Sequence, residues 1–227
     1  MAKQEDIFQL IDNNDKASLD KIREHLKAHP QEATKEDRDG RLPLHMAIQW
    51  NLHPNIVEFI LKTHPGAAAK KDKDGRLPLH FATQCNSELY IVELILNAYP
   101  QAVFQKDKSR TIMWLLDSSS RADINIFGKT PIDFAKQHYC KKDVIKVLES
   151  ALDKFMDRVP KEFICPITSD IMNDPVVAED ENTYERAAIV QWFEDHNTSP
   201  LTNVVLESKK VILNRALKSL IDSYIGN

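Results

Sequence analysis

The sequence contains little glycine and little cysteine. Only five glycines occur in 227 residues, which argues against an all-β protein with many tight turns. The three cysteines, Cys85, Cys140 and Cys165, are odd in number and far apart, so they predict neither a disulfide framework nor a zinc site. We expect three buried, unreactive thiols.

Long apolar runs and a strong excess of one charge are also missing. No stretch approaches the roughly 20 apolar residues of a membrane helix, and residues 1–6 lack the apolar core of a secretory signal. With 42% hydrophobic and 28% charged residues, the composition is that of a globular protein. A net charge of −4 lacks the basic excess that is typical of a nucleic-acid-binding protein. We therefore predict a soluble, cytoplasmic protein with neither nucleic acid nor a membrane as partner.

The charges are unevenly distributed along the chain. Residues 1–158 carry 24 basic and 23 acidic side chains, whereas residues 159–227 carry 6 basic and 11 acidic ones. An acidic C-terminal region favours a basic protein partner.

An internal repeat with a period of 35 residues dominates the first half of the sequence. The segment Asp39–His45 recurs as Asp74–His80, and the same offset superposes three prolines, Pro30, Pro65 and Pro100. In each copy a proline suits the first turn of a short helix. A second helix follows, with apolar residues spaced for one buried face: Ile56, Val57, Ile60 and Leu61. One such helix pair cannot bury its own apolar face, so neighbouring units must stack.

This unit resembles the ankyrin repeat, through Leu42–Ala47 and its second copy. The resemblance implies that His45 and His80 tie neighbouring units together and do not bind metal. The charged turns at 35–41 and 70–76 are expected to be solvated tips. They also give the candidate substrate-binding residues Arg41, Asp72, Lys73 and Arg76.

The remaining units are less regular. Residues 6–28 keep helical spacing without the signature and predict a capping unit. The segment Thr111–Ser120 is interpreted as a degenerate first helix whose partner is missing, because a new start follows at Gly128–Ala135. This gives three units, one of them truncated, and a cap. Residues 141–158 predict a last amphipathic helix, and Pro160 sets the boundary at Val159. The predicted domains are 1–140, a connecting helix at 141–158, and 159–227.

The C-terminal region predicts a small mixed fold. Residues 159–167 read as extended, 174–177 as a turn and a short strand, and 182–186 as a capping segment. Two amphipathic helices follow, one over 187–196 and one over 214–225, the second with four residues on one face: Leu217, Leu220, Ile221 and Tyr224.

This order of motifs closely resembles the U-box family over about 65 residues, from Phe163 and Cys165-Pro166-Ile167 to Ile221. The resemblance implies a RING-shaped fold held by hydrogen bonds, ion pairs and packing in place of zinc. The predicted fold class is mostly α with small β (α+β), an ankyrin-repeat helical solenoid followed by a zinc-free, RING-like U-box. No cofactor and no metal are predicted.

The resemblance also implies a docking groove for a ubiquitin-conjugating enzyme (E2). Carried over by position, Ile167 is its apolar anchor, Trp192 its aromatic wall and Pro200 its rim, with Pro166 and Ser169 beside them. Asn203 occupies the position of a donor that orients ubiquitin.

Four positions depart from the family pattern. Ser169 replaces a large apolar residue, Glu181 a common glycine and Leu213 a common proline. Asn203 replaces a longer donor, often arginine, and its own side chain can donate only over a short distance.

Two functions from different classes follow. The first is a U-box ubiquitin ligase that docks a charged E2 and promotes transfer to a substrate lysine, without a covalent intermediate, while the ankyrin repeats recruit the substrate. The alternative is an ankyrin adaptor or scaffold whose U-box is structural, dimerising or inactive. The sequence fits either a eukaryotic protein or a bacterial effector acting in host cytoplasm. A small-molecule enzyme lacks support, because no phosphate loop, triad spacing or metal cluster occurs.

Overall fold

The computed structural model describes residues 6–12, 16–108 and 128–225. Its chain divides into two compact units, residues 1–155 and 156–227. Helix predominates in both, and all strands among the described residues lie in the C-terminal unit. The predicted mostly α class with a small β component is thus confirmed. No described helix has the length and apolar character that crossing a bilayer requires.

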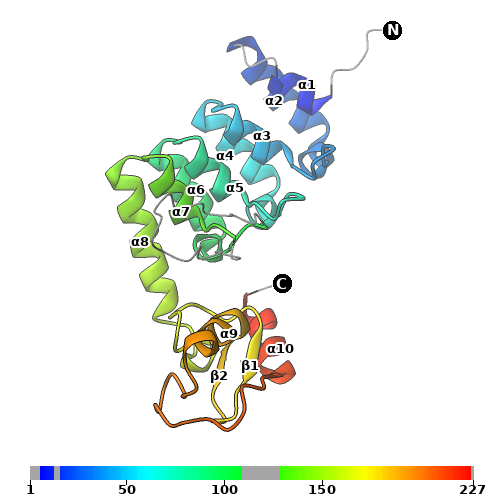
Figure 1. Cartoon of the computed structure of the whole chain (residues 1–227). Helices are drawn as coiled ribbons and strands as arrows, with labels where there is room; N and C mark the ends of the chain where they lie inside the picture. Colours follow the sequence, from blue (N-terminus) through cyan, green and yellow to red (C-terminus); the bar gives the residue numbers. More distant parts are fainter. Residues whose placement is uncertain (1–5, 13–15, 109–127, 226–227) are drawn as a thin grey trace. The chain divides into compact units, whose positions relative to one another are not determined.

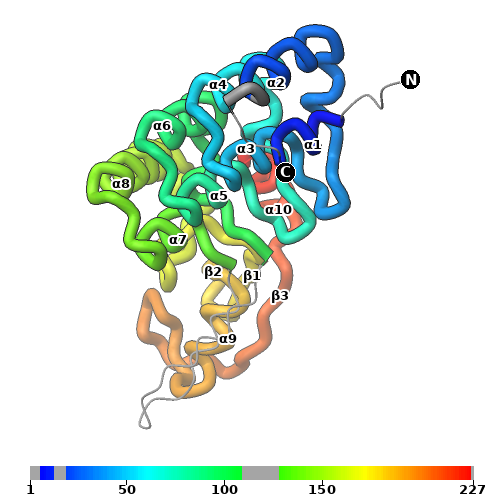
Figure 2. The backbone as a smooth tube through the Cα atoms, turned by 90° about the horizontal axis from the view of Figure 1, so that it is seen from above, coloured from blue at the N-terminus to red at the C-terminus, as the bar shows by residue number. Residues whose placement is uncertain are grey.

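The N-terminal unit is a stack of helix pairs (Figures 1 and 2). Its first helices are α1 (Ile7–Asp12), α3 (Pro43–Gln49), α5 (Pro78–Gln84) and α7 (Pro131–Gln137). The second helices are α2 (Lys16–Ala28), α4 (Pro54–Thr63), α6 (Leu89–Ala98) and α8 (Lys142–Met156). The 3-10 turns η1 (Pro30–Thr34), η2 (Pro65–Ala69) and η3 (Pro100–Val103) follow the first three second helices. The predicted helices of the repeat are confirmed, and each repeated proline begins a helix or a 3-10 turn.

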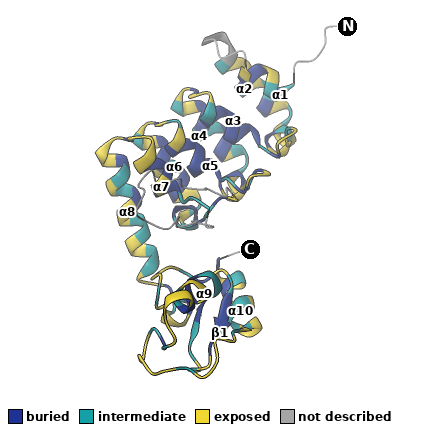
Figure 3. Cartoon of the chain, in the orientation of Figure 1, coloured by how far each residue is buried: buried dark blue, intermediate teal, exposed yellow. Residues whose placement is uncertain are grey.

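The core of this unit forms where first helices stack on first helices and second helices stack on second helices. The first helices pack in series, α1 on α3, α3 on α5 and α5 on α7, and α2, α4 and α6 pack in a second series. Fully buried residues such as Leu44, Ile48, Ile60 and Leu79 lie between the two series, as the dark helices of Figure 3 show. Val144 and Leu148 of α8 belong to the same core.

The turn of the third unit joins residues that are far apart in the sequence. Asp107 donates its N–H to the carbonyl of Lys129 at 3.0 Å, and Lys129 donates its N–H to the Asp107 carboxylate at 2.7 Å. Asp72 and Arg76 make the same two bonds four residues apart. The third unit therefore begins its turn at Asp107 and continues into α7. The helix predicted at Thr111–Ser120 lies outside the described residues.

The C-terminal unit contains a three-stranded antiparallel sheet of order β2-β1-β3. After η4 (Lys161–Phe163), strand β1 (Pro175–Val177) pairs with β2 (Thr183–Glu185) and with β3 (Ile212–Leu213). Helix α9 (Arg186–Asp195) packs against β2, and α10 (Arg215–Ile225) against β1. The segment 182–186 was predicted as a helix cap; it is mainly strand, because Val176 and Tyr184 pair across the hairpin.

The apolar face of α10 also differs from the prediction. Ile221 and Ile225 are buried, but Leu220 is 59% exposed. Tyr224 is 38% exposed and packs its ring edge against Phe163. Helical spacing placed Leu220, Ile221 and Tyr224 on one side, and only packing decides which of them is buried.

Candidate functional site

Two loops of the C-terminal unit have the same backbone structure. In loop 1 (residues 165–171) Cys165 N–H bonds to Asp170 O and Ser169 N–H to Cys165 O, both at 2.8 Å. In loop 2 (residues 199–205) Ser199 N–H bonds to Val204 O at 2.9 Å and Asn203 N–H to Ser199 O at 3.0 Å.

The two loop sequences also correspond at an offset of 34, Cys-Pro-Ile-Thr-Ser-Asp-Ile against Ser-Pro-Leu-Thr-Asn-Val-Val. Bridges close both loops, Ile164 with Ile171 and Thr198 with Val205. Ser169 (φ 59°) and Asn203 (φ 58°) are equivalent and share a left-handed conformation, which asparagine tolerates better than serine. The sequence analysis missed this correspondence, although the shared Pro-x-Thr pattern would have revealed it.

Loop 1 is anchored through Cys165 and Glu185. The thiol of Cys165 is fully buried and accepts a hydrogen bond from Glu185 N–H at 3.2 Å. The Glu185 carboxylate accepts the N–H groups of Asn173 at 2.6 Å and Asp174 at 3.1 Å. Arg186 donates to the Asp174 carboxylate at 2.6 Å. The bonds made by Cys165 and by the Glu185 carboxylate fix the loop at the start of α9.

Loop 2 is anchored on the carboxylate of Asp180. This group accepts hydrogen bonds from the hydroxyls of Tyr184, at 2.7 Å, and Ser199, and from Asn182 N–H at 3.1 Å. Burial opposes ionisation of Asp180, but the bonds from Ser199, Tyr184 and Asn182 outweigh it and lower the Asp180 pKa. Burial, together with the bond to Asp180, raises the pKa of Tyr184 to about 12. The Ser199 hydroxyl in turn accepts N–H groups of loop 2.

Within the ranges that the structure describes, no group of three or more His, Cys, Asp or Glu side chains is arranged to hold an ion. Loop 1 is held through the Cys165 thiol and the Glu185 carboxylate, and loop 2 through the Asp180 carboxylate and the Ser199 hydroxyl.

The predicted E2-docking residues lie on loop 1, loop 2 and α9. Pro166 and Ser169 are exposed, Ile167 and Pro200 are partly exposed, and Asn203 is exposed.

Trp192 is partly exposed, and its indole N–H donates to Thr198 O at 2.8 Å, which ties α9 to the start of loop 2. The ring stacks on His196 with centroids 3.9 Å apart. These two contacts fix the orientation of the indole.

Leu201 is a further surface residue that the sequence analysis did not select. It is the loop 2 counterpart of Ile167 and is 53% exposed. Each loop therefore presents one proline and one large aliphatic side chain at the same position.

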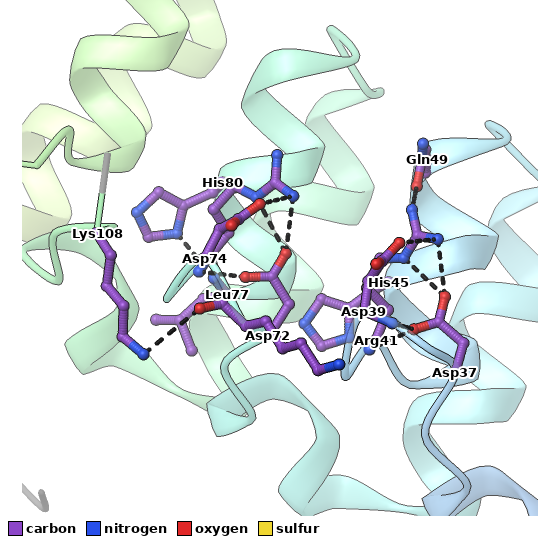
Figure 4. A network of polar contacts seen from close by, with 12 residues as sticks. Asp37, Asp39, Arg41, His45, Gln49, Asp72, Asp74, Leu77, His80 and Lys108 are labelled. Carbon is purple, nitrogen blue, oxygen red and sulfur yellow. Dashed lines mark hydrogen bonds and ion pairs between the residues drawn. The ribbon is translucent and has the colours of Figure 1, made fainter. Parts of the chain in front are cut away.

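In the N-terminal unit the predicted substrate-binding residues lie in the turns before α3 and α5 (Figure 4). Arg41 pairs with Asp37 at 2.8 Å, and Arg76 pairs with Asp72 at 3.0 Å and with Asp74 at 2.8 Å. Asp72 is only 5% exposed, so the prediction of a wholly solvated tip is wrong for this residue. Lys73 is exposed.

The two histidines join neighbouring turns. His45 Nδ1 accepts the N–H of Leu42 at 3.0 Å, and Nε2 lies 3.1 Å from Lys70 O of the next unit. His80 repeats both contacts with Leu77 and Lys129. Burial lowers the pKa of each imidazole to about 4, although Asp72 and Asp107 respectively oppose the shift. Both rings are therefore neutral at pH 7, with Nδ1 as acceptor and Nε2–H as donor.

The structural halves match two known families. The family model of ankyrin repeats (3 copies) matches residues 8–107, and that of the U-box domain matches residues 159–227. Together they agree with the two kinds of unit observed.

Curated relatives match about a third of this chain. U-box domain-containing protein 4 of rice is 49% identical over 69 residues, which are 30% of this chain and 10% of that protein. The human WD repeat, SAM and U-box domain-containing protein 1 is 40% identical over 82 residues, 36% of this chain and 17% of that protein. A probable bifunctional E2/E3 enzyme of Acanthamoeba polyphaga mimivirus is 46% identical over 74 residues, 33% of this chain and 6% of that protein. This chain thus covers less than a fifth of the length of each of these three relatives. It is an ankyrin-repeat protein with a C-terminal U-box domain.

Proposed function

We propose that this protein is a ubiquitin ligase in which the U-box docks a ubiquitin-charged E2 and the ankyrin repeats recruit the substrate. The observation that carries the proposal is the pair of equivalent loops, each anchored internally and each presenting an exposed or partly exposed Pro-aliphatic tip. The name of the mimivirus relative, a probable bifunctional E2/E3 enzyme, supports it. A charged E2 and its substrates occur in the cytoplasm. If the chain is a bacterial effector, this is the cytoplasm of the host cell.

The E2-docking surface consists of Pro166, Ile167, Trp192, Pro200 and Leu201. Ile167 and Leu201 would bury their side chains on the E2, and Trp192 would form the wall between the loops. Weak transient interfaces are small, below roughly 1,200 Å², and micromolar affinity corresponds to about −8 kcal/mol. A single buried anchor is then a large fraction of the binding free energy.

The chemistry requires no nucleophile from this chain. Cys165 is fully buried and its sulfur accepts a hydrogen bond, so it is shielded from a thioester. The substrate amine would attack the thioester carbonyl on the E2, and the E2 thiolate would leave. The protein would contribute proximity of the two reactants, and the Asn203 side chain would orient ubiquitin from loop 2.

The test is discharge of ubiquitin from a panel of charged E2 enzymes by the full chain. Ile167→Ala should reduce the discharge rate at subsaturating protein by roughly thirtyfold, the cost of about 2 kcal/mol for a hot spot. The melting temperature should stay unchanged, because this side chain is partly exposed in a loop. Leu220→Ala is the matched control, since Leu220 is an exposed aliphatic residue on α10, outside the two loops, and it should discharge normally.

Equal discharge by Ile167→Ala and the unmodified chain would contradict the assigned surface. The alternative function is an ankyrin adaptor with an inactive U-box. It is favoured by the short side chains of Ser169 and Asn203, which stand at positions where the U-box pattern has longer side chains. Absence of discharge with every E2, in a folded protein, would support that alternative.

A further inference from the structure

The turns of the second and third ankyrin units carry an excess of positive charge. The described residues at 70–76, 105–108 and 128–129 contain seven cations and three acids. The cations are Lys70, Lys71, Lys73, Arg76, Lys106, Lys108 and Lys129. The turn of the first unit, residues 35–41, contains three of each, so the excess is confined to two of the three turns. We call residues 70–76, 105–108 and 128–129 the basic turn surface.

The acids of this surface are already used inside the turns. Asp72 and Asp74 both pair with Arg76, and Asp107 receives the backbone N–H of Lys129. They hold each turn in shape, as Asp37 and Asp39 do with Arg41. The local carboxylates are therefore committed to cations and N–H groups at the base of the turns.

Lys73 and Lys108 are exposed at equivalent positions one repeat apart. Each donates its backbone N–H to the preceding turn, Lys73 to Asp39 O at 2.9 Å and Lys108 to Asp74 O at 2.7 Å. Their ammonium groups point to backbone carbonyls of the neighbouring turn, that of Lys108 to Lys73 O at 3.4 Å, as Figure 4 shows for Lys108. Among the described side chains, neither ammonium pairs with a carboxylate.

A buried amide donor that finds no acceptor among the described residues lies next to Lys71. Gln105 is 5% exposed, and its Oε1 accepts a hydrogen bond from Lys71 Nζ at 2.8 Å. Its Nε2 has no hydrogen-bond partner within the described part of the chain. Burial and the neighbouring charge of Lys108 both lower the pKa of Lys71, which shows that cations are crowded here. A buried N–H donor needs an acceptor, and a carboxylate satisfies both the donor and the excess charge.

We propose that the basic turn surface binds an acidic, carboxylate-rich peptide segment, with Lys73 and Lys108 at its rim and the Lys71–Gln105 pair at its base. That this segment belongs to the ligase substrate rests on the function proposed above; the binding itself does not. A short acidic segment fits better than a nucleic acid, because the whole chain carries −4 and disfavours a long polyanion.

The test uses the full chain and a fluorescein-labelled peptide of about 12 residues in which glutamate alternates with glycine. Binding is measured by fluorescence anisotropy. The variant Lys73→Glu/Lys108→Glu should bind roughly tenfold more weakly, equal to about 1.4 kcal/mol. Its matched control is Lys142→Glu/Lys146→Glu, which makes the same change of charge at exposed positions of α8 and should bind normally. Gln105→Leu, which removes the buried donor, should weaken binding severalfold, and a glutamine–glycine peptide should not bind.

Equal weakening by the two double variants, or no binding by the unmodified chain, would overturn the proposal. Tighter binding of a single-stranded DNA of matched charge, lost in the same variant, would assign the surface to nucleic acid instead. If the reversal variant fails to fold, Lys73→Gln/Lys108→Gln provides the same comparison. Discharge of ubiquitin from a charged E2 to free lysine should be normal in every variant. Loss of peptide binding with intact discharge therefore separates this proposal from the ligase activity.

Discussion

The ankyrin unit and the U-box stabilise their turns and loops in different ways. In the ankyrin unit one set of bonds repeats: an aspartate closes each turn, a histidine caps the helix, and a glycine occupies the left-handed position in the first two turns, Gly40 at φ 75° and Gly75 at φ 77°. In the U-box each loop has its own anchor, Cys165 with Glu185 or Asp180 with Ser199. The left-handed positions there are occupied by Ser169, Glu181 and Asn203.

The comparison shows how redundancy is distributed. In the repeats, loss of one turn bond leaves its copies in place. In the U-box, the Asp180 carboxylate anchors loop 2 through Ser199, and no copy of this anchor holds loop 1. We therefore expect the two units to respond differently to acid, to loss of a carboxylate and to relief of backbone strain.

The largest difference is expected in mild acid. His45 and His80 have folded pKa values of about 4 against about 6.5 when unfolded. The unfolded chain therefore binds more protons between these values. The stabilisation is complete above pH 6.5 and is lost as the pH falls towards 4, by roughly 3 kcal/mol per histidine. No histidine of the described U-box residues is buried, so that unit should be less affected.

Urea unfolding of the full chain labelled with 5-fluorotryptophan would separate the two units, because Trp50 reports on the repeats and Trp192 on the U-box. Between pH 7 and pH 5 the midpoint at Trp50 should fall more than that at Trp192. A constant midpoint at Trp50 would contradict the assignment of neutral, buried imidazoles.

The next effect is loss of the loop 2 anchor. Asp180→Ala leaves the hydroxyl of the fully buried Tyr184 and the Ser199 hydroxyl without their shared acceptor. An unsatisfied buried partner costs about 1–3 kcal/mol, so the Trp192 urea midpoint should fall accordingly while that of Trp50 is unchanged. E2 discharge should fall with it, since loop 2 carries Pro200 and Leu201.

Asp174→Ala is the matched control, because Asp174 pairs with Arg186 when both side chains are well exposed and such pairs contribute at most about 1 kcal/mol. A chelator should leave the Trp192 urea midpoint unchanged in both variants and in the unmodified chain. An equal fall of the Trp192 midpoint in the two variants would mean that Asp180 stabilises the U-box no more than the exposed Asp174 does.

The smallest effect concerns backbone strain. Glu181 has φ 62° in the turn between β1 and β2, a conformation that costs a residue with a side chain roughly 1–2 kcal/mol. Glu181→Gly should therefore stabilise the U-box by about 1 kcal/mol, measured at Trp192.

Gly75→Ala provides the opposite case in the repeats. A Cβ at Gly75 would lie 2.8 Å from a side-chain carbon of Lys108 and 3.1 Å from its N, so this substitution should destabilise the unit at Trp50. Stabilisation by Gly75→Ala, or destabilisation by Glu181→Gly, would show that left-handed strain does not differ between the units.

Much of the ankyrin unit was predictable because its signals are local and repeated. The 35-residue offset fixed α3 to α6, the prolines marked helix starts, and the predicted role of His45 and His80 is confirmed by their contacts with the next turn. The third unit was less predictable, because Asp107 and Lys129, which bond to each other in its turn, are 22 residues apart. No local pattern records such a long-range contact.

The sequence by itself determined the order of the units, the family of each and the loop residues proposed for E2 docking. Tertiary structure decided the correspondence of loops 1 and 2, the anchoring role of Asp180, the burial of Asp72 and the unpaired donor of Gln105. The physical reason is that periodicity reports only which face of a helix or strand is apolar. A hydrogen bond between Asp180 and Ser199, 19 residues apart, depends on how the chain folds back, and no local pattern records it.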